Sequence, residues 1–160
     1  MPAITPFLWF NDKAEEAANF YVSIFPNSKI LSVSRYGDAG PGPKGSVMTV
    51  NFELDGHAFT ALNGGPHYSF TPGVSFLVPC DTQQEVDHYW QKLTAGGKPV
   101  QCGWLEDKYG LSWQIVPKAL FRLMKEKDPA AAQRVMQAML QMVKLDIAGL
   151  KRAYDGKSAA

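Results

Sequence analysis

The chain has little cysteine, little histidine and no long apolar segment. Only two of its 160 residues are cysteine, and only three are histidine. Two thiols, Cys80 and Cys102, cannot form a disulfide scaffold, so a reduced, cytoplasmic setting is expected. Two cysteines and three histidines are also too few for a cysteine-rich zinc site. No apolar run approaches the roughly 18 residues that cross a bilayer, and the N-terminus lacks the features of a secretion signal, so no membrane partner is expected.

The chain also has a low net charge and few charged residues. The formal net charge is +1, and only 19% of the residues are charged. Nucleic-acid binding driven by bulk charge is therefore not expected. The charge is uneven, because residues 118–160 carry nine lysines and arginines against four acids. Helix faces that contact solvent explain the excess of basic residues in this tail. The alternative is that the tail attracts an anionic partner.

The first half has the pattern of one strand, one helix and three further strands. Residues 4–10 read as a strand, and Asp12 is the expected cap of a helix that ends at Pro26-Asn27. Strands are predicted at 29–36, 46–54 and 58–63, the last two joined by the tight-turn pair Asp55-Gly56. Residues 37–45, with four glycines and two prolines, have no side chain that suits a core, so this loop is expected to be mobile.

The second half repeats the order of the first. A strand at 74–78 is followed by a helix that Asp81 or Thr82 caps, with capping-box spacing to Glu85. The helix ends at Gly96-Gly97, and short strands are predicted near 98–103 and 111–116. A shift of 69 residues superposes Asp12 on Asp81 and Lys29 on Lys98, whereas residues 59–62 match 113–116 at a shift of 54.

Two copies of a βαβββ module define the expected fold class, which is α+β. Each module forms a curved antiparallel sheet with a helix behind it, and the other faces of the two sheets enclose a cleft. The expected domains are a first module at 1–70, a shorter second module at 71–118 and a helical extension at 119–160. The extension is predicted to hold one or two amphipathic helices, one of them starting at Asp128-Pro129.

Apolar side chains exceed what one helix face of the extension needs, which favours a homodimer. The surplus comprises Val135, Met136, Met139, Leu140, Met142, Val143, Leu145, Ile147 and Leu150. Ordinary core packing of a methionine-rich face is the alternative, and an adaptable lid is another.

Several segments resemble one known family. The duplicated βαβββ unit is similar to the vicinal-oxygen-chelate superfamily, which includes glyoxalase I, extradiol dioxygenases and bleomycin-resistance proteins. The matching segments resemble its PhnB-like branch, often labelled 3-demethylubiquinone-9 3-methyltransferase. They are residues 4–10 (ITPFLWF), Phe20-Tyr21, 62–66 (LNGGP), 74–76 (VSF), 109–117 (YGLSWQIVP) and 135–147 (VMQAMLQMVKLDI).

The resemblance implies where a metal would bind in metal-dependent relatives. The corresponding positions here hold Thr5, Thr60, Val74 and Gln114, none of which is an anionic or imidazole ligand. No metal and no cofactor is therefore expected. Methyl transfer is not expected either, because Gly37–Gly45 joins two predicted strands, whereas a nucleotide-like cofactor needs a glycine-rich turn from a strand into a helix.

The residues on the inward strand faces and at the rim predict an aromatic-walled pocket with a few hydroxyl and amide groups. A filled core without a cavity is the alternative. The candidate ligand-binding residues are Thr5, Phe7, Trp9, Thr60, Leu62, Asn63, His67, Tyr68, Phe76, Trp104 and Gln114.

The function expected from these observations is metal-independent binding of a small hydrophobic or aromatic molecule, as in the antibiotic-sequestering relatives that the resemblance brings in. An enzyme of unknown reaction in the same cleft is the alternative. It would be metal-dependent and similar to a lyase or dioxygenase, or a methyltransferase as the family label suggests. The sequence does not decide whether the chain is an enzyme.

Overall fold

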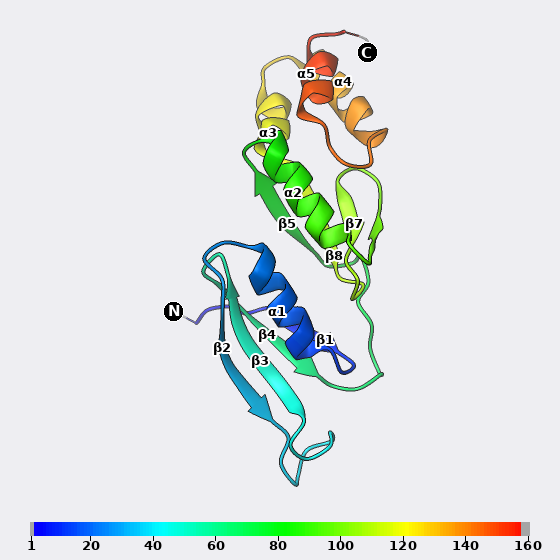
Figure 1. Cartoon of the computed structure of the whole chain (residues 1–160). Coiled ribbons are helices and arrows are strands. Elements are labelled where there is room, and N and C mark those ends of the chain that lie inside the picture. The colour runs from blue at the N-terminus through cyan, green and yellow to red at the C-terminus, as the bar shows by residue number, and fades with distance from the viewer. Residues whose placement is uncertain (1, 158–160) are drawn as a thin grey trace. The chain divides into compact units, whose positions relative to one another are not determined.

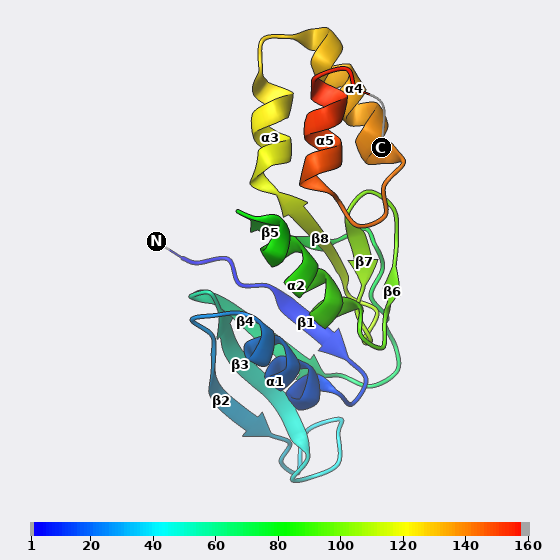
Figure 2. The ribbon, with the colours of Figure 1, turned by 45° about the horizontal axis from the view of Figure 1, so that its top comes forward.

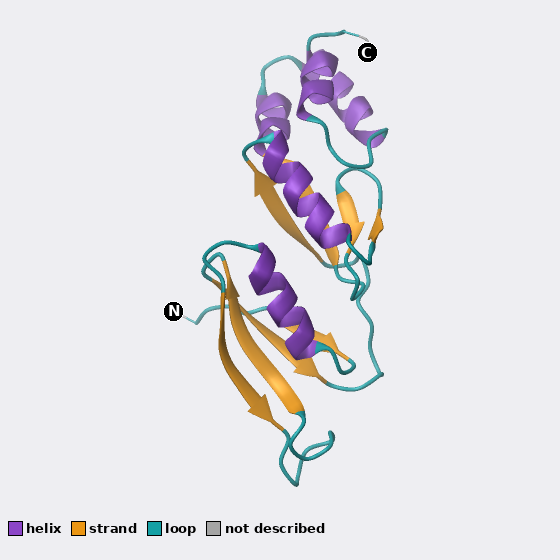
Figure 3. Cartoon of the chain, viewed as in Figure 1, coloured by secondary structure: helices purple, strands orange, loops and turns teal. Residues whose placement is uncertain are grey.

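The computed structural model describes residues 2–157 and divides the chain into two compact units, with the boundary after Phe70. Each unit contains a four-stranded sheet with one helix lying across one face (Figures 1 and 3). The second unit also carries three C-terminal helices. The α+β fold with two βαβββ modules and C-terminal helices is confirmed.

The first unit runs β1 (Phe7–Phe10), α1 (Ala14–Ile24), β2 (Lys29–Arg35), β3 (Val47–Leu54) and β4 (His57–Asn63). Its sheet has the order β1-β4-β3-β2. β1 and β4 are parallel, so the sheet is mixed and not wholly antiparallel as expected. Asp55 and Gly56 join β3 to β4 with φ angles of 47° and 76°, as the predicted tight turn requires.

α1 packs its small residues against one face of this sheet. Ala14, Ala17 and Ala18 are fully buried, and Tyr21 stacks on Phe52 of β3. Asp12 is not the helix cap, so that prediction is wrong. The N-cap position is Lys13, which makes no side-chain cap bond, and Asn63 Oδ1 accepts the hydrogen bond from the Ala14 amide at 2.8 Å instead. A tertiary contact thus replaces the local cap.

The second unit begins with β5 (Ser75–Cys80), α2 (Gln83–Thr94), β6 (Lys98–Pro99), β7 (Trp104–Glu106) and β8 (Ser112–Pro117). Its sheet has the order β5-β8-β7-β6, and β5 and β8 are parallel. The capping box at α2 is confirmed. The Glu85 amide donates to Thr82 Oγ1 at 3.1 Å, and the Asp81 amide donates to Glu85 Oε2 at 2.7 Å.

The two modules have the same strand order, and each has an ion pair between corresponding strands. Lys29 pairs with Glu53 between β2 and β3 at 3.7 Å, and Lys98 pairs with Glu106 between β6 and β7 at 3.3 Å. The first strands correspond at a shift of 70 residues and not 69, because Leu77 occupies in its sheet the place that Phe7 occupies in the other. Slipping a strand by one residue reverses which side chains share a face.

The extension contains three helices, where one or two were expected: α3 (Lys118–Lys125), α4 (Pro129–Leu140) and α5 (Ile147–Tyr154). They gather beyond the end of β8 (Figure 2). Asp128 caps α4, as predicted, and Asp146 caps α5 by accepting from the Gly149 amide at 2.8 Å. The extra cap separates two helices where the apolar periodicity alone reads as one.

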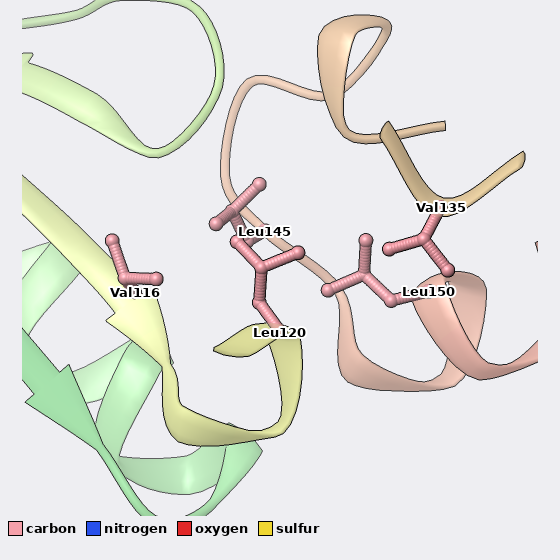
Figure 4. Close-up of a cluster of buried hydrophobic side chains, with 5 residues drawn as sticks. All are labelled: Val116, Leu120, Val135, Leu145 and Leu150. Atoms are coloured by element: carbon pink, nitrogen blue, oxygen red, sulfur yellow. The ribbon is translucent and has the colours of Figure 1, made fainter. Parts of the chain in front are cut away.

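The extension packs on its own unit through a cluster of buried aliphatic side chains. β8 supplies one member and the three helices and the α4–α5 connection supply the others (Figure 4). The members are Val116, Leu120, Val135, Leu145 and Leu150. Part of the apolar surplus of the extension is therefore core. None of the helices in the described chain combines the length and apolarity that crossing a membrane requires.

The glycine- and proline-rich loop 37–45 packs on Tyr36, which is 6% exposed. A Cβ atom at Gly40 would lie 2.4 Å from the Tyr36 ring, and one at Gly42 would lie 2.3 Å from it. The loop is also closed at its base, where the Gly45 amide donates to the Tyr36 carbonyl at 2.8 Å. The glycine backbone therefore contacts the tyrosine ring directly, although the loop has no apolar side chain in the core, and its mobility stays a prediction.

Candidate functional site

The face of the first sheet that α1 leaves uncovered brings together four of the predicted ligand-binding residues. Strand side chains alternate, so the buried residues of β1, Leu8 and Phe10, point toward the helix, and Phe7 and Trp9 point the other way. Phe7 lies opposite Thr60 of β4, and Trp9 lies opposite Leu62. We call this surface the first open face.

A glycine pair positions Trp9 on the first open face. The Trp9 indole Nε1 donates to the Gly65 carbonyl at 3.0 Å. A Cβ atom at Gly64 would lie 2.3 Å from the Trp9 ring, so only glycine admits the ring there. Tyr68 meets the ring edge-on, with 4.9 Å between centroids. This arrangement gives a physical reason for the LNGGP segment at residues 62–66.

Three polar side chains form a ladder across the middle of the first open face. Thr60 Oγ1 donates to Asn51 Oδ1 at 2.7 Å, and Asn51 Nδ2 donates to Ser32 Oγ at 3.0 Å. The ladder therefore crosses β4, β3 and β2 in one direction. One amide hydrogen of Asn51, the hydroxyl hydrogen of Ser32 and the lone pairs of Thr60 remain for other partners.

The centre of the first open face carries no charge. Beside the ladder, Ser34 and Thr49 are joined by a hydrogen bond between their hydroxyl groups. The charged residues lie at the two ends. The ion pair of Lys29 with Glu53 is at one end, and Arg35, which donates to the Gly45 carbonyl at 3.1 Å, is at the other. The face therefore offers aromatic surface, hydroxyls and an amide, but no unpaired carboxylate at its centre.

The second sheet has a corresponding open face that includes Gln114. Gln114 lies opposite Leu77 on β5 and Trp104 on β7, and its Nε2 donates to Ser75 Oγ at 2.9 Å. Two predicted residues, Gln114 and Trp104, are thus neighbours.

Phe76 is not on this face, so that prediction is wrong. It lies opposite Trp113, with 5.6 Å between the ring centroids, and Trp113 is buried on the α2 side of the sheet. The assumed shift of 69 placed Val74 and Phe76 beside Gln114. The true shift of 70 places Ser75 and Leu77 there, and Val74 precedes the strand.

The remaining predicted residues are separated from the ladder. Thr5 is exposed and precedes β1. Asn63 points to the helix side, where it caps α1 and donates to the Val47 carbonyl at 3.1 Å. Tyr68 is 68% exposed and reaches the site only through Trp9. His67 is exposed in the loop that follows β4.

The side chains at the positions of the family's metal ligands do not fit a catalytic metal. Thr60 offers a hydroxyl and Gln114 an amide, and the register replaces Val74 by the hydroxyl of Ser75. Hydroxyl and amide groups are poor ligands for divalent transition metals. Among residues 2–157, no group of three or more histidine, cysteine, aspartate or glutamate side chains is placed to hold a metal ion.

The glycine-rich loop does not fit a nucleotide-like methyl donor. Residues 37–45 connect the antiparallel strands β2 and β3, which pair from Lys29–Glu53 to Arg35–Val47. A phosphate-binding glycine loop leads from a strand into a helix, whose N-terminal amides hold the ligand. Here the loop's glycines pack on Tyr36 instead.

Asn51 and Ser32 were missed by sequence reasoning. Alternation along β3 places Asn51 between the buried Val50 and Phe52, which marks it as a residue of the open face. Counting back through the Asp55-Gly56 turn aligns Asn51 with Thr60, so the sequence alone is sufficient to predict this pairing. Ser32 could not be placed, because an irregularity in β2 shifts its register between Ile30 and Ser32.

Comparison with known proteins agrees with this fold. A family model described as 3-demethylubiquinone-9 3-methyltransferase matches residues 2–116. A PhnB protein from Bacillus cereus, provisionally described as a 3-demethylubiquinone-9 3-methyltransferase, is 41% identical with a TM-score of 0.67. The match covers 72% of this chain and 99% of that one. No curated protein matches the chain.

More distant structures share the fold. Protein PA1353 from Pseudomonas aeruginosa is 21% identical with a TM-score of 0.61, over 73% of this chain and 98% of that one. The fosfomycin resistance protein FosX from Listeria monocytogenes is 15% identical with a TM-score of 0.50, over 73% of this chain and 93% of that one. α3 to α5 lie beyond the family match, which ends at residue 116. The chain therefore belongs to the PhnB-like 3-demethylubiquinone-9 3-methyltransferase family, which has the vicinal-oxygen-chelate fold.

Proposed function

We propose that this chain is a metal-independent small-molecule-binding protein whose ligand lies on the first open face. The observation that carries the proposal is the ladder of Ser32, Asn51 and Thr60 beside the exposed ring of Phe7 and the half-buried ring of Trp9. Aromatic walls with a few directed polar groups are typical of sites for small organic ligands.

The ligand class follows from the chemistry of this face. Its centre is uncharged, so a neutral ligand avoids the cost of leaving a charge unpaired. The amide of Asn51 has a hydrogen to give, and the hydroxyl of Thr60 has lone pairs that accept. A flat or hydrophobic molecule with a carbonyl or hydroxyl group suits both properties.

Ligand capture tests this proposal. We expect native mass spectrometry of the purified protein to show a bound small molecule that is recovered unchanged. Thr60→Val should reduce its occupancy, since the change removes a hydroxyl at nearly constant shape. Thr94→Val is the matched control, because it removes a hydroxyl whose hydrogen bond, to the Trp90 carbonyl at 2.6 Å, lies within α2.

The same experiment includes the outcomes that would refute the proposal. Recovery of a chemically altered molecule would favour an enzyme over a binder. One equivalent of zinc, nickel, iron or manganese per chain after dialysis would refute metal independence. Equal ligand loss in both variants would show that the ladder is not part of the binding site.

We also propose that the chain forms a homodimer. Apolar side chains of the extension outside the buried cluster support this, among them Phe121, Leu140 and Val143, which are all exposed. Sedimentation at micromolar concentration tests it, since a particle of 17.6 kDa would be a monomer and would refute the dimer.

A further inference from the structure

The pair Asn63-Gly64 joins the last residue of β4 to the loop that follows, and it is the one Asn-Gly pair in the chain. The other asparagines are followed by larger residues, which are Asp12, Phe20, Ser28 and Phe52. An asparagine before glycine is the pair most open to deamidation, because glycine has no side chain that hinders attack by its own backbone nitrogen.

Deamidation at this pair would pass through a cyclic imide. The Gly64 nitrogen loses its proton and attacks Asn63 Cγ, so that a C–N bond forms and the side-chain amide leaves as ammonia. Water then opens the imide at either of its two carbonyl carbons, which gives aspartate or isoaspartate at position 63. The reaction therefore requires a free Gly64 N–H group and an Asn63 side chain that can turn toward it.

The native structure holds the peptide unit that would react. The Gly64 N–H group donates to the Phe10 carbonyl at 2.9 Å, so its proton is engaged in the fold. At the other end of the same peptide unit, the Asn63 carbonyl accepts from the Tyr36 hydroxyl at 2.5 Å. Two hydrogen bonds from two different segments thus oppose rotation of this peptide unit.

The side chain that would be attacked is held as well. Asn63 is half-buried, and its Oδ1 accepts from the Ala14 amide at 2.8 Å. Its Nδ2 donates to the Val47 carbonyl at 3.1 Å. Turning Cγ toward the Gly64 nitrogen would break both hydrogen bonds, so the native state disfavours the attack.

The residues next to the reacting bond position Trp9. The Gly65 carbonyl accepts from Trp9 Nε1 at 3.0 Å, and the Trp9 ring leaves no room for a Cβ atom at Gly64. Isoaspartate routes the main chain through the former side chain, which adds a methylene group immediately before these two glycines. We propose that Asn63 is a deamidation site that the fold keeps unreactive, and that isoaspartate at position 63 removes the glycine contacts of Trp9.

Peptide mass spectrometry of protein incubated in mildly alkaline buffer, native and in urea, tests this proposal. We expect conversion at Asn63 to be at least about tenfold slower in the native protein, because the reaction requires local opening. In urea, Asn63→Gln should show no conversion at this position, since the larger ring that glutamine would have to form closes far more slowly.

A single hydroxyl group tests the role of the fold. Tyr36→Phe removes the donor to the Asn63 carbonyl and should speed native conversion about twofold to tenfold, as loss of one hydrogen bond does. Tyr154→Phe is the matched control, because it removes a hydroxyl from the second unit, and it should leave the native rate unchanged. All chains with Asn63 should react equally fast in urea.

Three results would overturn the proposal. They are equal conversion in the native protein and in urea, equal native rates in Tyr36→Phe and Tyr154→Phe, and a refolded isoaspartate form whose NMR signal for the Trp9 indole N–H is unchanged. None of these measurements involves a ligand, so the proposed function stands or falls separately.

Discussion

Asn63 closes the N-terminus of α1 from 49 positions away: its Oδ1 accepts a hydrogen bond from the Ala14 amide at 2.8 Å. The other half of the same side-chain amide donates to the Val47 carbonyl at 3.1 Å. Asn63 thus ties the helix to both sides of the loop that leads from β2 to β3, because its backbone carbonyl also accepts a hydrogen bond from the Tyr36 hydroxyl.

Asn63→Ala should therefore lower the free energy of unfolding by about 1–3 kcal/mol, the cost of a lost cap and a buried unpaired carbonyl. Urea denaturation measures the change. Asn63→Asp is the matched variant, since it keeps the acceptor for Ala14 and loses the donor to Val47. It should fall between the wild type and Asn63→Ala, and a loss as large as that of Asn63→Ala would contradict the capping role.

Asp107 is a buried carboxylate that organises the turn before β8. Its Oδ1 accepts from the Tyr109 amide at 2.8 Å and the Leu111 amide at 3.1 Å, and its Oδ2 accepts from Trp113 Nε1 at 2.9 Å. Asp107→Ala leaves these donors unpaired, so it should cost about 2–4 kcal/mol of unfolding free energy. Glu106→Gln, which breaks only the partly exposed ion pair with Lys98, should cost about 0.5 kcal/mol. Similar losses of unfolding free energy in the two variants would show that the hydrogen bonds of Asp107 stabilise the fold no more than the ion pair does.

Cys80 should be unreactive in the native protein. The pKa of its thiol is raised to about 12, first by burial and then by the nearby carboxylates of Glu85 and Asp81. Because the thiolate is the nucleophile, iodoacetamide at pH 8 should label Cys80 of the native Cys102→Ala variant at least about a hundredfold more slowly than in denaturant. Equal rates in the two conditions would contradict the burial.

The same thiol links stability to pH. An unfolded cysteine ionises near its ordinary pKa of 9.0, whereas the native thiol holds its proton until about pH 12. The stability that this difference contributes is complete below pH 9. It should be lost progressively as the pH rises from 9 to 12.

Gln83 fastens the C-terminal extension to the second module. Its Nε2 donates to the Leu145 carbonyl at 3.1 Å, and its Oε1 accepts from the Ile147 amide at 2.8 Å. Gln83→Ala should speed hydrogen exchange at the start of α5 by about tenfold, because one orphan amide and one carbonyl lose their partners. Gln84→Ala, an exposed neighbour in the same turn, should not. Equal exchange in both variants would show that Gln83 is dispensable.

The fold could be predicted because local signals and the internal repeat agreed. The Asp55-Gly56 turn, the Thr82 capping box and the Asp128-Pro129 helix start are decided by neighbouring residues, and all three are confirmed. The cap of α1 could not be found, because Asn63 reaches it through tertiary structure. The contact between the 37–45 loop and the Tyr36 ring could not be found either, because glycine backbone makes it and no apolar side chain signals it.

The site was predictable only where the strand register was. Alternation placed Phe7 and Trp9 correctly on one face, and pairing with β4 brings Thr60 and Leu62 beside them. In the second module a single-residue error in the repeat shift moved Phe76 to the wrong face. Side-chain direction in a strand has period two, so an offset that is nearly right gives a face that is entirely wrong.

An amide NMR titration with benzamide tests whether the ladder on the first open face binds a neutral ligand. Benzamide is flat, uncharged and carries a carbonyl, as the proposed ligand class requires. We expect signal shifts at Phe7, Asn51 and Thr60 that are lost in Thr60→Val and retained in Thr94→Val. Shifts confined to other residues, or shifts at these residues that Thr60→Val leaves unchanged, would contradict it.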